Sequence, residues 1–428
     1  MQLDARKVPT RVVLIIFLLI ATVWSYFAVR WYLGNTIAEY FNAGDNNLDI
    51  AQVAENLAPR DPITHWRLGQ VAQKKLPLDQ TGIALGEFEK AVALSPNDYR
   101  FWMTLGTARE QAGEPQKAEA ALRQAIALAP SYAYPHWYLG NSLLRSGRYD
   151  EAFRELRLAS EADPEALRSQ LFNLVWEIYS NDPQALANAI GTNPETRANF
   201  ALYLVSQKKY DEGLKVWNGL SAEDKKVNKT SGDSIVSTLI SILRFHEALN
   251  IWNELAPTAG YKAEVGRMTD GSFEEVLTYG SDTIFGWQVK SAPQTQVGID
   301  PSVSHYGSRS LRMVFQVRNQ LDATLISQLV AVDKDTAYDF ECYVKTAKFE
   351  SGGPLTIQIL DANSGATLAA SDSATSGDND WTRAGLSFKT TDKSEAVTIR
   401  IYRSGCGENV PCPIFGNVWY DDFSIKRH

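Results

Sequence analysis

The sequence predicts a multidomain α + β protein: an N-terminal transmembrane helix, an α-helical solenoid and a C-terminal antiparallel β-sandwich. Three observations predict this class: an uncharged apolar run at residues 12–29, a 34-residue repeat, and short alternating strands in the last third. A chain of 428 residues is also too long for one hydrophobic core. The expected segments are an N-terminal tail 1–11, a transmembrane helix 12–33, a spacer 34–47, a solenoid 48–257, a linker 258–269 and a β-sandwich 270–428.

The apolar run near the N-terminus is long enough to span a bilayer. It holds 18 uncharged residues, and Trp and Tyr residues gather toward its C-terminal end, where an interfacial belt would lie. Three basic residues precede the run and only Arg30 follows it closely. The positive-inside rule therefore predicts a cytoplasmic N-terminus and places the rest of the chain outside the cytoplasm. The alternative is a cleaved signal peptide, which the lack of a small-x-small site after the run disfavours.

The middle of the chain repeats with a period of 34 residues. Shifting residues 133–166 back by 34 aligns Leu139-Gly140 with Leu105-Gly106, Ala152 with Ala118, Leu156 with Leu122 and Pro164 with Pro130. Small residues let two antiparallel helices approach closely, the larger residues fill the space beside them, and the prolines end the second helix. The pattern resembles the tetratricopeptide repeat, a helix–turn–helix unit that buries its apolar face only by stacking on neighbours.

Weaker copies of the repeat extend the array in both directions. An earlier unit covers residues 62–94, and Gly213 with Trp217 repeats 35 residues later as Ala248 with Trp252. We interpret residues 48–257 as one continuous solenoid of about five to six helix pairs. The alternative, three true repeats followed by a separate helical domain, stays open.

The resemblance to tetratricopeptide repeats implies a concave groove lined by the first helix of each unit. It places in that groove Trp66, Gln70, Arg100, Met103, Tyr134, Trp137 and Asn141. This aromatic, weakly charged surface suits an apolar helix or an extended peptide of a protein partner. The alternative is that Trp66 and Trp137 merely pack against adjacent repeats. The Lys/Asn carboxylate clamp of chaperone-binding repeats is absent, so an acidic C-terminal peptide is not implied.

From Asp270 onward, alternating apolar and polar residues separated by Gly, Asp and Ser predict a two-sheet β-sandwich. Five features resemble the jelly-roll carbohydrate-binding modules: residues 270–274 (DGSFE), 286–287 (GW), 305–311 (HYGSRSL), Trp381 before the strand 386–388, and 416–424 (GNVWYDDFS). The resemblance implies that aromatic rings stack on sugars, with Trp287, Tyr306, Tyr343, Trp381 and Tyr402 as candidates. The alternative for each ring is core or edge packing. Trp419 alternates in phase with Phe423 and Ile425, which predicts a place in the core.

The same resemblance implies a structural calcium ion where the first and last strands meet. Glu274 and Asp421 are the matching acidic residues, and oxygen ligands of this kind suit Ca²⁺. The alternative is that backbone amides and Arg309 satisfy these carboxylates. Cys406 and Cys412 bracket a short loop, and a disulfide is expected there if the domain lies outside the cytoplasm; otherwise both remain free thiols.

Catalysis has little support in the sequence. No HExxH, phosphate-cradling glycine loop, GxSxG or CxxC motif occurs, so we predict no catalytic residue and no cofactor beyond the calcium. His65 and His136 occupy equivalent repeat positions, which marks them as scaffold. The net charge of −8 and the pI near 5.3 argue against nucleic-acid binding.

These features together predict a non-catalytic, membrane-anchored scaffold. The repeats would dock a protein partner, and the β-sandwich would bind envelope polysaccharide or exopolysaccharide. Resemblance alone places it as a single-pass protein of a bacterial inner (cytoplasmic) membrane, with the bulk of the chain in the periplasm. The alternatives are a purely protein–protein scaffold and an envelope glycan hydrolase, which needs two acidic residues about 5–10 Å apart in one cleft.

Overall fold

The chain divides into two compact units, Met1–Thr192 and Asn193–His428. The computed structural model describes residues 8–40, 47–74, 81–255, 262–275, 284–290, 292, 294–316, 323–406 and 412–428. The boundary between the units falls inside the stretch expected to form one solenoid, so the last helices belong to the same unit as the strands.

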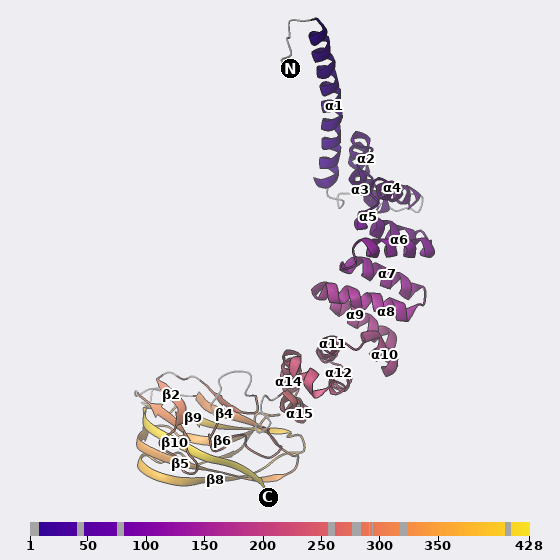
Figure 1. The fold of residues 1–428 in the computed structure, drawn as a ribbon. Coiled ribbons are helices and arrows are strands. Elements are labelled where there is room, and N and C mark those ends of the chain that lie inside the picture. The colour runs from indigo at the N-terminus through magenta and orange to yellow at the C-terminus, as the bar shows by residue number, and fades with distance from the viewer. Residues whose placement is uncertain are drawn as a thin grey trace. The chain divides into compact units, whose positions relative to one another are not determined.

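The first unit is helical (Figure 1). Its helices are α1 (Val8–Tyr40), α2 (Leu48–Leu57), α3 (Pro62–Lys74), α4 (Thr81–Leu94), α5 (Tyr99–Gln111), α6 (Pro115–Leu128), α7 (Ala133–Arg145), α8 (Tyr149–Ala162), α9 (Pro164–Tyr179) and α10 (Pro183–Ile190). From α3 to α8 they pair as helix–turn–helix units, and each unit packs on the next. The repeat predicted from the 34-residue period is therefore confirmed.

A glycine on the first helix sets the distance between the two helices of each unit. A Cβ atom at Gly106 would lie 2.6 Å from Leu122 Cγ, and one at Gly140 would lie 2.6 Å from Leu156 Cγ. Ala118 on the second helix is completely buried. Only glycine allows the leucine of the second helix to seat against the backbone of the first, because any Cβ would overlap it.

The predicted scaffold histidines fasten the helices at equivalent points. His136 Nδ1 lies 2.6 Å from the Glu155 carboxylate, and its Nε2 lies 3.0 Å from the Pro130 carbonyl oxygen. His65 makes the same pair of contacts with Glu87 and Pro59. Hydrogen bonding to Glu155 raises the pKa of His136 above its ordinary value. Both rings therefore tie a first helix to the turn before it and to the second helix.

Helix α1 extends well past the expected membrane segment. Among the described residues it is the one helix long and apolar enough, by length and composition, to cross a membrane. It continues beyond Leu33 to Tyr40, and these last turns pack on α2 and α3: Asn35 Nδ2 donates to Asp61 Oδ2 at 3.0 Å, and Arg67 Nε donates to the Ala38 carbonyl at 2.8 Å. Ala38 is completely buried, so this end of α1 is part of the repeat array.

The second unit begins with five helices and continues into the β-sandwich. The helices are α11 (Pro194–Ser206), α12 (Tyr210–Asn218), α13 (Ala222–Val227), α14 (Lys229–Ser241) and α15 (Phe245–Leu255). They pack around the buried ring of Trp217. The last helix packs against the segments that flank β1 and β4, because the ring of Trp252 lies 5.7 Å from that of Phe285 and His246 Nε2 lies 3.0 Å from the Val332 carbonyl oxygen.

Within the described residues, ten strands form two antiparallel sheets with a common core. The strands are β1 (Trp287–Val289), β2 (Thr295–Asp300), β3 (Ser310–Phe315), β4 (Ala323–Ala331), β5 (Ala337–Ser351), β6 (Leu355–Asp361), β7 (Thr367–Ala370), β8 (Gly377–Lys389), β9 (Ala396–Arg403) and β10 (Ile414–Arg427). One sheet has the order β1-β4-β9-β6-β7 and the other β2-β3-β10-β5-β8. Alternate residues of both sheets meet in one apolar cluster, as the period-2 pattern predicts.

Trp419 is buried, as predicted, with 8% of its surface exposed, but it lies on the opposite face of the sheet from Phe423 and Ile425. The register between β10 and β5 shifts between Asp421 and Ser424, and Asp422 has a φ of 52°. This bulge reverses the side-chain alternation, so Tyr420 rather than Trp419 joins the core with Phe423. The Trp419 ring instead packs on the outer face beneath the Arg312 guanidinium, 5.4 Å away, and donates a hydrogen bond to Asp300.

The close contact between paired helices generates the first testable prediction. Gly140→Ala places a Cβ against Leu156, so it should lower the free energy of unfolding by about 1–3 kcal/mol. The matched control is Gly86→Ala in α4, where no atom lies within 4 Å of an added Cβ; alanine there should be neutral or stabilising by about 0.5–1 kcal/mol. Chemical unfolding of the two variants provides the comparison, and equal effects would contradict the packing argument.

Candidate functional site

A groove of about 870 Å³ lies across the first helices of three successive units. It is lined by residues of α5, α7 and α9, with one leucine from α6: Thr107, Glu110, Gln111, Leu122, Trp137, Tyr138, Asn141, Ser142, Arg145, Ser169, Gln170, Asn173 and Leu174. First helices of stacked helix pairs face the same side, so each unit contributes the same few helix positions to this groove.

The groove is neutral and rich in amide and hydroxyl groups. Its two charged side chains pair with each other, because Arg145 Nε donates to Glu110 Oε1 at 2.9 Å. Ser142 donates to the other oxygen of Glu110. Around this pair lie the rings of Trp137 and Tyr138. Such a lining can hydrogen-bond a peptide backbone and pack against apolar side chains, and it offers no unpaired charge to an ionic ligand.

Two of the seven predicted groove residues, Trp137 and Asn141, line this groove. Gln170 and Asn173 also line the groove, and the 34-residue period does not predict them because they lie 32 residues after Tyr138 and Asn141. The shorter offset arises because α9 begins directly after Asp163, whereas four residues separate α6 from α7.

The other five predicted groove residues lie outside this lining. Trp66 is half-buried; its Nε1 donates to Thr104 Oγ1 at 3.0 Å, so it packs on the adjacent unit. Gln70 accepts a hydrogen bond from Arg67, and Arg100 forms an ion pair with Asp98. Met103 packs on the core cluster that contains Leu122, and the Tyr134 ring lies near the Tyr138 ring.

The five candidate sugar-stacking rings do not form one strip. Trp287 is only 3% exposed; it stacks on Phe273 and contacts Phe423, so its faces are unavailable to a glycan. Tyr402 lies on the other sheet from Tyr343, in β9, beneath the Arg400 guanidinium at 4.4 Å.

The remaining three rings gather near His305, which the sequence reasoning did not single out as a site residue. The His305 ring stacks on Tyr343 with centroids 3.7 Å apart and meets the edge of Trp381 at 5.7 Å. Its Nδ1 lies 2.6 Å from Asp422 Oδ2. Tyr306 is 77% exposed beside it. One face of Tyr343 is thus covered by the imidazole, which leaves Trp381 and Tyr306 as the accessible rings.

The two carboxylates expected to hold calcium fasten the loop that carries His305. Asp421 Oδ2 accepts hydrogen bonds from the backbone amides of His305 and Tyr306, at 2.8 and 3.3 Å. Glu274 accepts from the amides of Ser308 and Arg309, and from the Ser308 hydroxyl, which lowers the pKa of Glu274.

These N–H donors point at the oxygens that a cation would need, so this arrangement does not fit calcium. The described residues also contain no group of three His, Cys, Asp or Glu side chains placed to hold a metal ion. Calcium therefore stays a prediction that rests on the resemblance alone.

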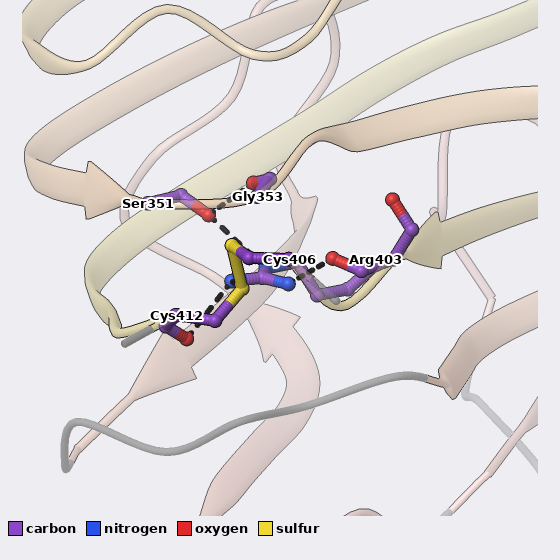
Figure 2. Close-up of a disulfide and its surroundings, with 6 residues drawn as sticks. Ser351, Gly353, Arg403, Cys406 and Cys412 are labelled. Carbon is purple, nitrogen blue, oxygen red and sulfur yellow. Dashed lines mark hydrogen bonds between the residues drawn. A yellow bond between two sulfur atoms is a disulfide. The ribbon is translucent and has the colours of Figure 1, made fainter. Parts of the chain in front are cut away.

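The structure joins Cys406 and Cys412 in a disulfide beside a completely buried arginine (Figure 2). Arg403 Nη2 donates to the Cys412 carbonyl at 3.1 Å, and its Nε donates to Ser351 Oγ at 3.1 Å. The guanidinium therefore ties the Cys412 end of the linkage to the end of β5. Cys342, in contrast, is a free thiol in the core, and burial raises its pKa.

Asp421 generates a pH prediction. Burial raises its pKa from 3.8 to about 6, so between pH 4 and 6 the folded chain holds a proton that the unfolded chain has lost. The contribution of Asp421 to stability therefore falls as the pH rises through this window. Between pH 4 and pH 7 the free energy of unfolding of Asp421→Asn should therefore decline by roughly 1–3 kcal/mol less than that of the wild type, as measured by chemical unfolding. The asparagine side chain also replaces a carboxylate that accepts hydrogen bonds from two backbone N–H groups, so the free energy of unfolding should be lower at every pH. An unchanged pH dependence would contradict the assignment.

Comparison with known proteins supports the repeat region. The tetratricopeptide repeat family model matches residues 78–133 and 103–166. The peroxisomal targeting signal receptor of Saccharomyces cerevisiae is 31% identical over 101 residues, which cover 24% of this chain and 16% of the receptor. The small glutamine-rich tetratricopeptide repeat-containing protein 2 of Mycosarcoma maydis is 30% identical over 91 residues, which cover 21% of this chain and 26% of the relative. The chain thus spans about a quarter or less of these relatives.

Solved structures with similarity to the chain include YrrB, described as a TPR protein with an unusual peptide-binding site. It is 19% identical, covers 44% of this chain and 90% of its own, and superposes with a TM-score of 0.32. A crystal structure of MamA protein is 16% identical, covers 51% of this chain and 95% of its own, and gives a TM-score of 0.29. Together with the helix pairing described above, the family match shows that the chain contains tetratricopeptide repeats.

Proposed function

We propose that this protein is a non-catalytic, membrane-anchored scaffold that holds a segment of a protein partner in the groove between α5, α7 and α9. Tetratricopeptide repeats mediate protein–protein interactions and are typically non-catalytic. The observation that carries the proposal is the lining of the groove: amides, hydroxyls and the Trp137 and Tyr138 rings, with its charges paired internally. An extended, uncharged peptide satisfies such a lining better than an acidic or basic one.

The proposal includes anchoring in a bacterial inner membrane through α1, with the chain after residue 33 on the outer side. The apolar side chains of α1 are exposed, Phe17 by 70% and Trp24 by 72%, which suits a lipid environment. The end of the same helix packs on α2 and α3, and Gly34 approaches Ala58 closely. A cleaved leader would remove a helix that is built into the fold, so this packing favours an uncleaved anchor. The Cys406–Cys412 disulfide also suits an oxidising compartment.

We further propose that the β-sandwich contacts envelope polysaccharide. Its strands β3-β10-β5-β8 and β4-β9-β6-β7 interleave between two sheets, as expected for the two Greek keys of a jelly roll. The dispersed rings favour the competing idea of a purely protein–protein scaffold, in which the sandwich is structural. A glycan therefore needs a site other than a continuous aromatic strip.

The groove generates a crosslinking prediction. A photoreactive amino acid at Gln170, inside the groove, should form a specific adduct with a partner in the native membrane, and one at Leu158, exposed on α8, should not. Adding Trp137→Ala should reduce the Gln170 adduct by about tenfold or more, because a buried aromatic anchor carries a large share of binding energy. The readout is the adduct band identified by mass spectrometry.

A matched variant separates lost binding from lost folding. Trp102→Ala changes an indole on the same set of first helices, which donates to the Pro96 carbonyl and does not line the groove. It should leave the Gln170 adduct intact. Equal adducts from Gln170 and Leu158, or an adduct unaffected by Trp137→Ala, would contradict docking in the groove.

Topology generates an independent prediction. A reporter that is active only in the periplasm, fused after His428, should be active, and a reporter active only in the cytoplasm should be silent at the same position. The mass of the purified chain should still include α1. Activity of the cytoplasmic reporter alone would overturn the proposed orientation, and a chain that begins after the apolar run would overturn the anchor.

A further inference from the structure

The charges on α1 mark the depth at which this helix would leave a bilayer. The 18 residues between Arg11 and Arg30 carry no charge. At a rise of about 1.5 Å per residue they span about 27 Å, which is close to the thickness of a hydrocarbon core. Arg30 therefore lies at the outer edge of that core in the proposed orientation. Trp31 and Tyr32 follow directly and are 52% and 63% exposed, as rings of an interfacial belt would be.

The turn between α2 and α3, residues 58–61, is fixed beside α1 just beyond this edge. Arg30 Nη2 donates to the Asn56 carbonyl oxygen at 2.7 Å, so the last turn of α2 is tied to α1. A Cβ atom at Gly34 would lie 2.7 Å from Ala58 Cβ, so the two backbones are in direct contact there. The turn therefore lies level with Gly34, one helical turn or about 6 Å beyond Arg30 along the axis of α1.

A height of about 6 Å above the hydrocarbon edge falls inside the headgroup layer of a bilayer. A bilayer is about 40–45 Å thick with its headgroups and about 30 Å thick without them, so each headgroup layer measures roughly 5–8 Å. Figure 1 shows α2 lying alongside the second half of α1. The packing of α2 on α1 thus brings part of the repeat array to the depth of the lipid phosphates.

The turn exposes an arginine that no carboxylate neutralises. Pro59 and Arg60 are exposed, and among the described residues Arg60 has no ion-pair or hydrogen-bond partner. The adjacent carboxylate, Asp61, is only 3% exposed, and it accepts hydrogen bonds from Asn35 and from the Ile63 amide. Asp61 therefore serves the fold, and the guanidinium of Arg60 faces solvent alone.

Arg30 adds a second guanidinium to the same place. Within the described chain its one hydrogen bond uses Nη2, so its other N–H groups stay available to a ligand. Glu55, on the same helical turn of α2 as Asn56, has a cation nearby: hydrogen bonding to Glu87, with the charges of Glu87 and Glu55, raises the pKa of Lys90. The surface around the turn is therefore cationic, although the chain as a whole carries a net charge of −8.

We propose that the α2–α3 turn is a phospholipid-binding surface, in which Arg60 and Arg30 hold the phosphates of headgroups on the outer face of the membrane. Guanidinium groups bind phosphate through paired N–H donors. The turn is continuous with the apolar side of α1, so a bilayer brings phosphates to this place. This inference rests on the anchoring part of the proposed function. It adds a second attachment, which holds the start of the repeat array against the bilayer.

The first test measures the depth of the turn with the full chain in nanodiscs of phosphatidylcholine and phosphatidylglycerol in equal amounts. The three native cysteines are a buried thiol and a disulfide, so a fluorophore can be attached to Pro59→Cys without reduction. Lipids with a spin label on the headgroup should quench most of its fluorescence. The same fluorophore at Gln116→Cys, exposed on α6, should remain unquenched. Asn56→Cys gives an independent reading if the cysteine at position 59 disturbs the turn.

The second test measures the lipids that stay bound when the full chain is extracted from the same nanodiscs in mild detergent, counted by mass spectrometry. The wild type should be enriched in phosphatidylglycerol, because phosphatidylcholine carries a compensating cation. Arg60→Ser should lower this enrichment about fivefold, the contribution of one basic residue near an anionic membrane surface. The matched control is Arg154→Ser, which removes an arginine on α8 that is also exposed and unpaired within the described residues, and the enrichment should not change.

The outcomes separate this inference from the anchor on which it rests. Fluorophores that stay unquenched at both Pro59→Cys and Asn56→Cys, in a chain that enters the nanodiscs, would overturn the inference while the anchor stood. A chain that does not enter nanodiscs would overturn the anchor itself. Equal enrichment in the wild type and Arg60→Ser, or an equal loss with Arg154→Ser, would exclude Arg60 as a phosphate-binding residue. The crosslinking result at Gln170 is independent of all of these.

Discussion

The helical half of the molecule depends on one contact, the seating of a large apolar side chain on the bare backbone of a glycine. Leu122 against Gly106 and Leu156 against Gly140 fix how closely the two helices of a unit approach. That distance sets how the next unit stacks, and the stacking aligns the first helices along one side. The groove exists because the contact recurs at a fixed interval, so it is a consequence of the helix packing and needs no further structural feature.

In the β-sandwich a local irregularity has the comparable role. The bulge in β10 at Asp421 and Asp422 turns Tyr420 inward and frees both carboxylates to hold the loop that carries His305. A regular strand would have placed Trp419 on the same face as Phe423 instead. The one extra residue thus produces two features of the same domain: the His305 stack on the outer face, and the burial of the Tyr420 ring between the sheets.

The architecture was predictable from the sequence because it follows from periods. A 34-residue spacing of Gly, Ala and Pro specifies paired helices, and alternation specifies strands. The sites were less predictable because they depend on departures from those periods. Gln170 and Asn173 fall two residues out of register because α9 follows α8 almost directly, and Trp419 changes face at the bulge. Trp287 resembles an exposed ring in sequence, yet it stacks on Phe273 in the core, a partner that no local pattern identifies.

The charge of the groove bears on the class of partner that we propose for it. The chain carries a net charge of −8, but the groove pairs its cation with its carboxylate, Arg145 with Glu110. The groove therefore presents no field that would attract an ionic ligand. A segment held there would be recognised by shape and by hydrogen bonds made in partly desolvated space, which salt weakens little.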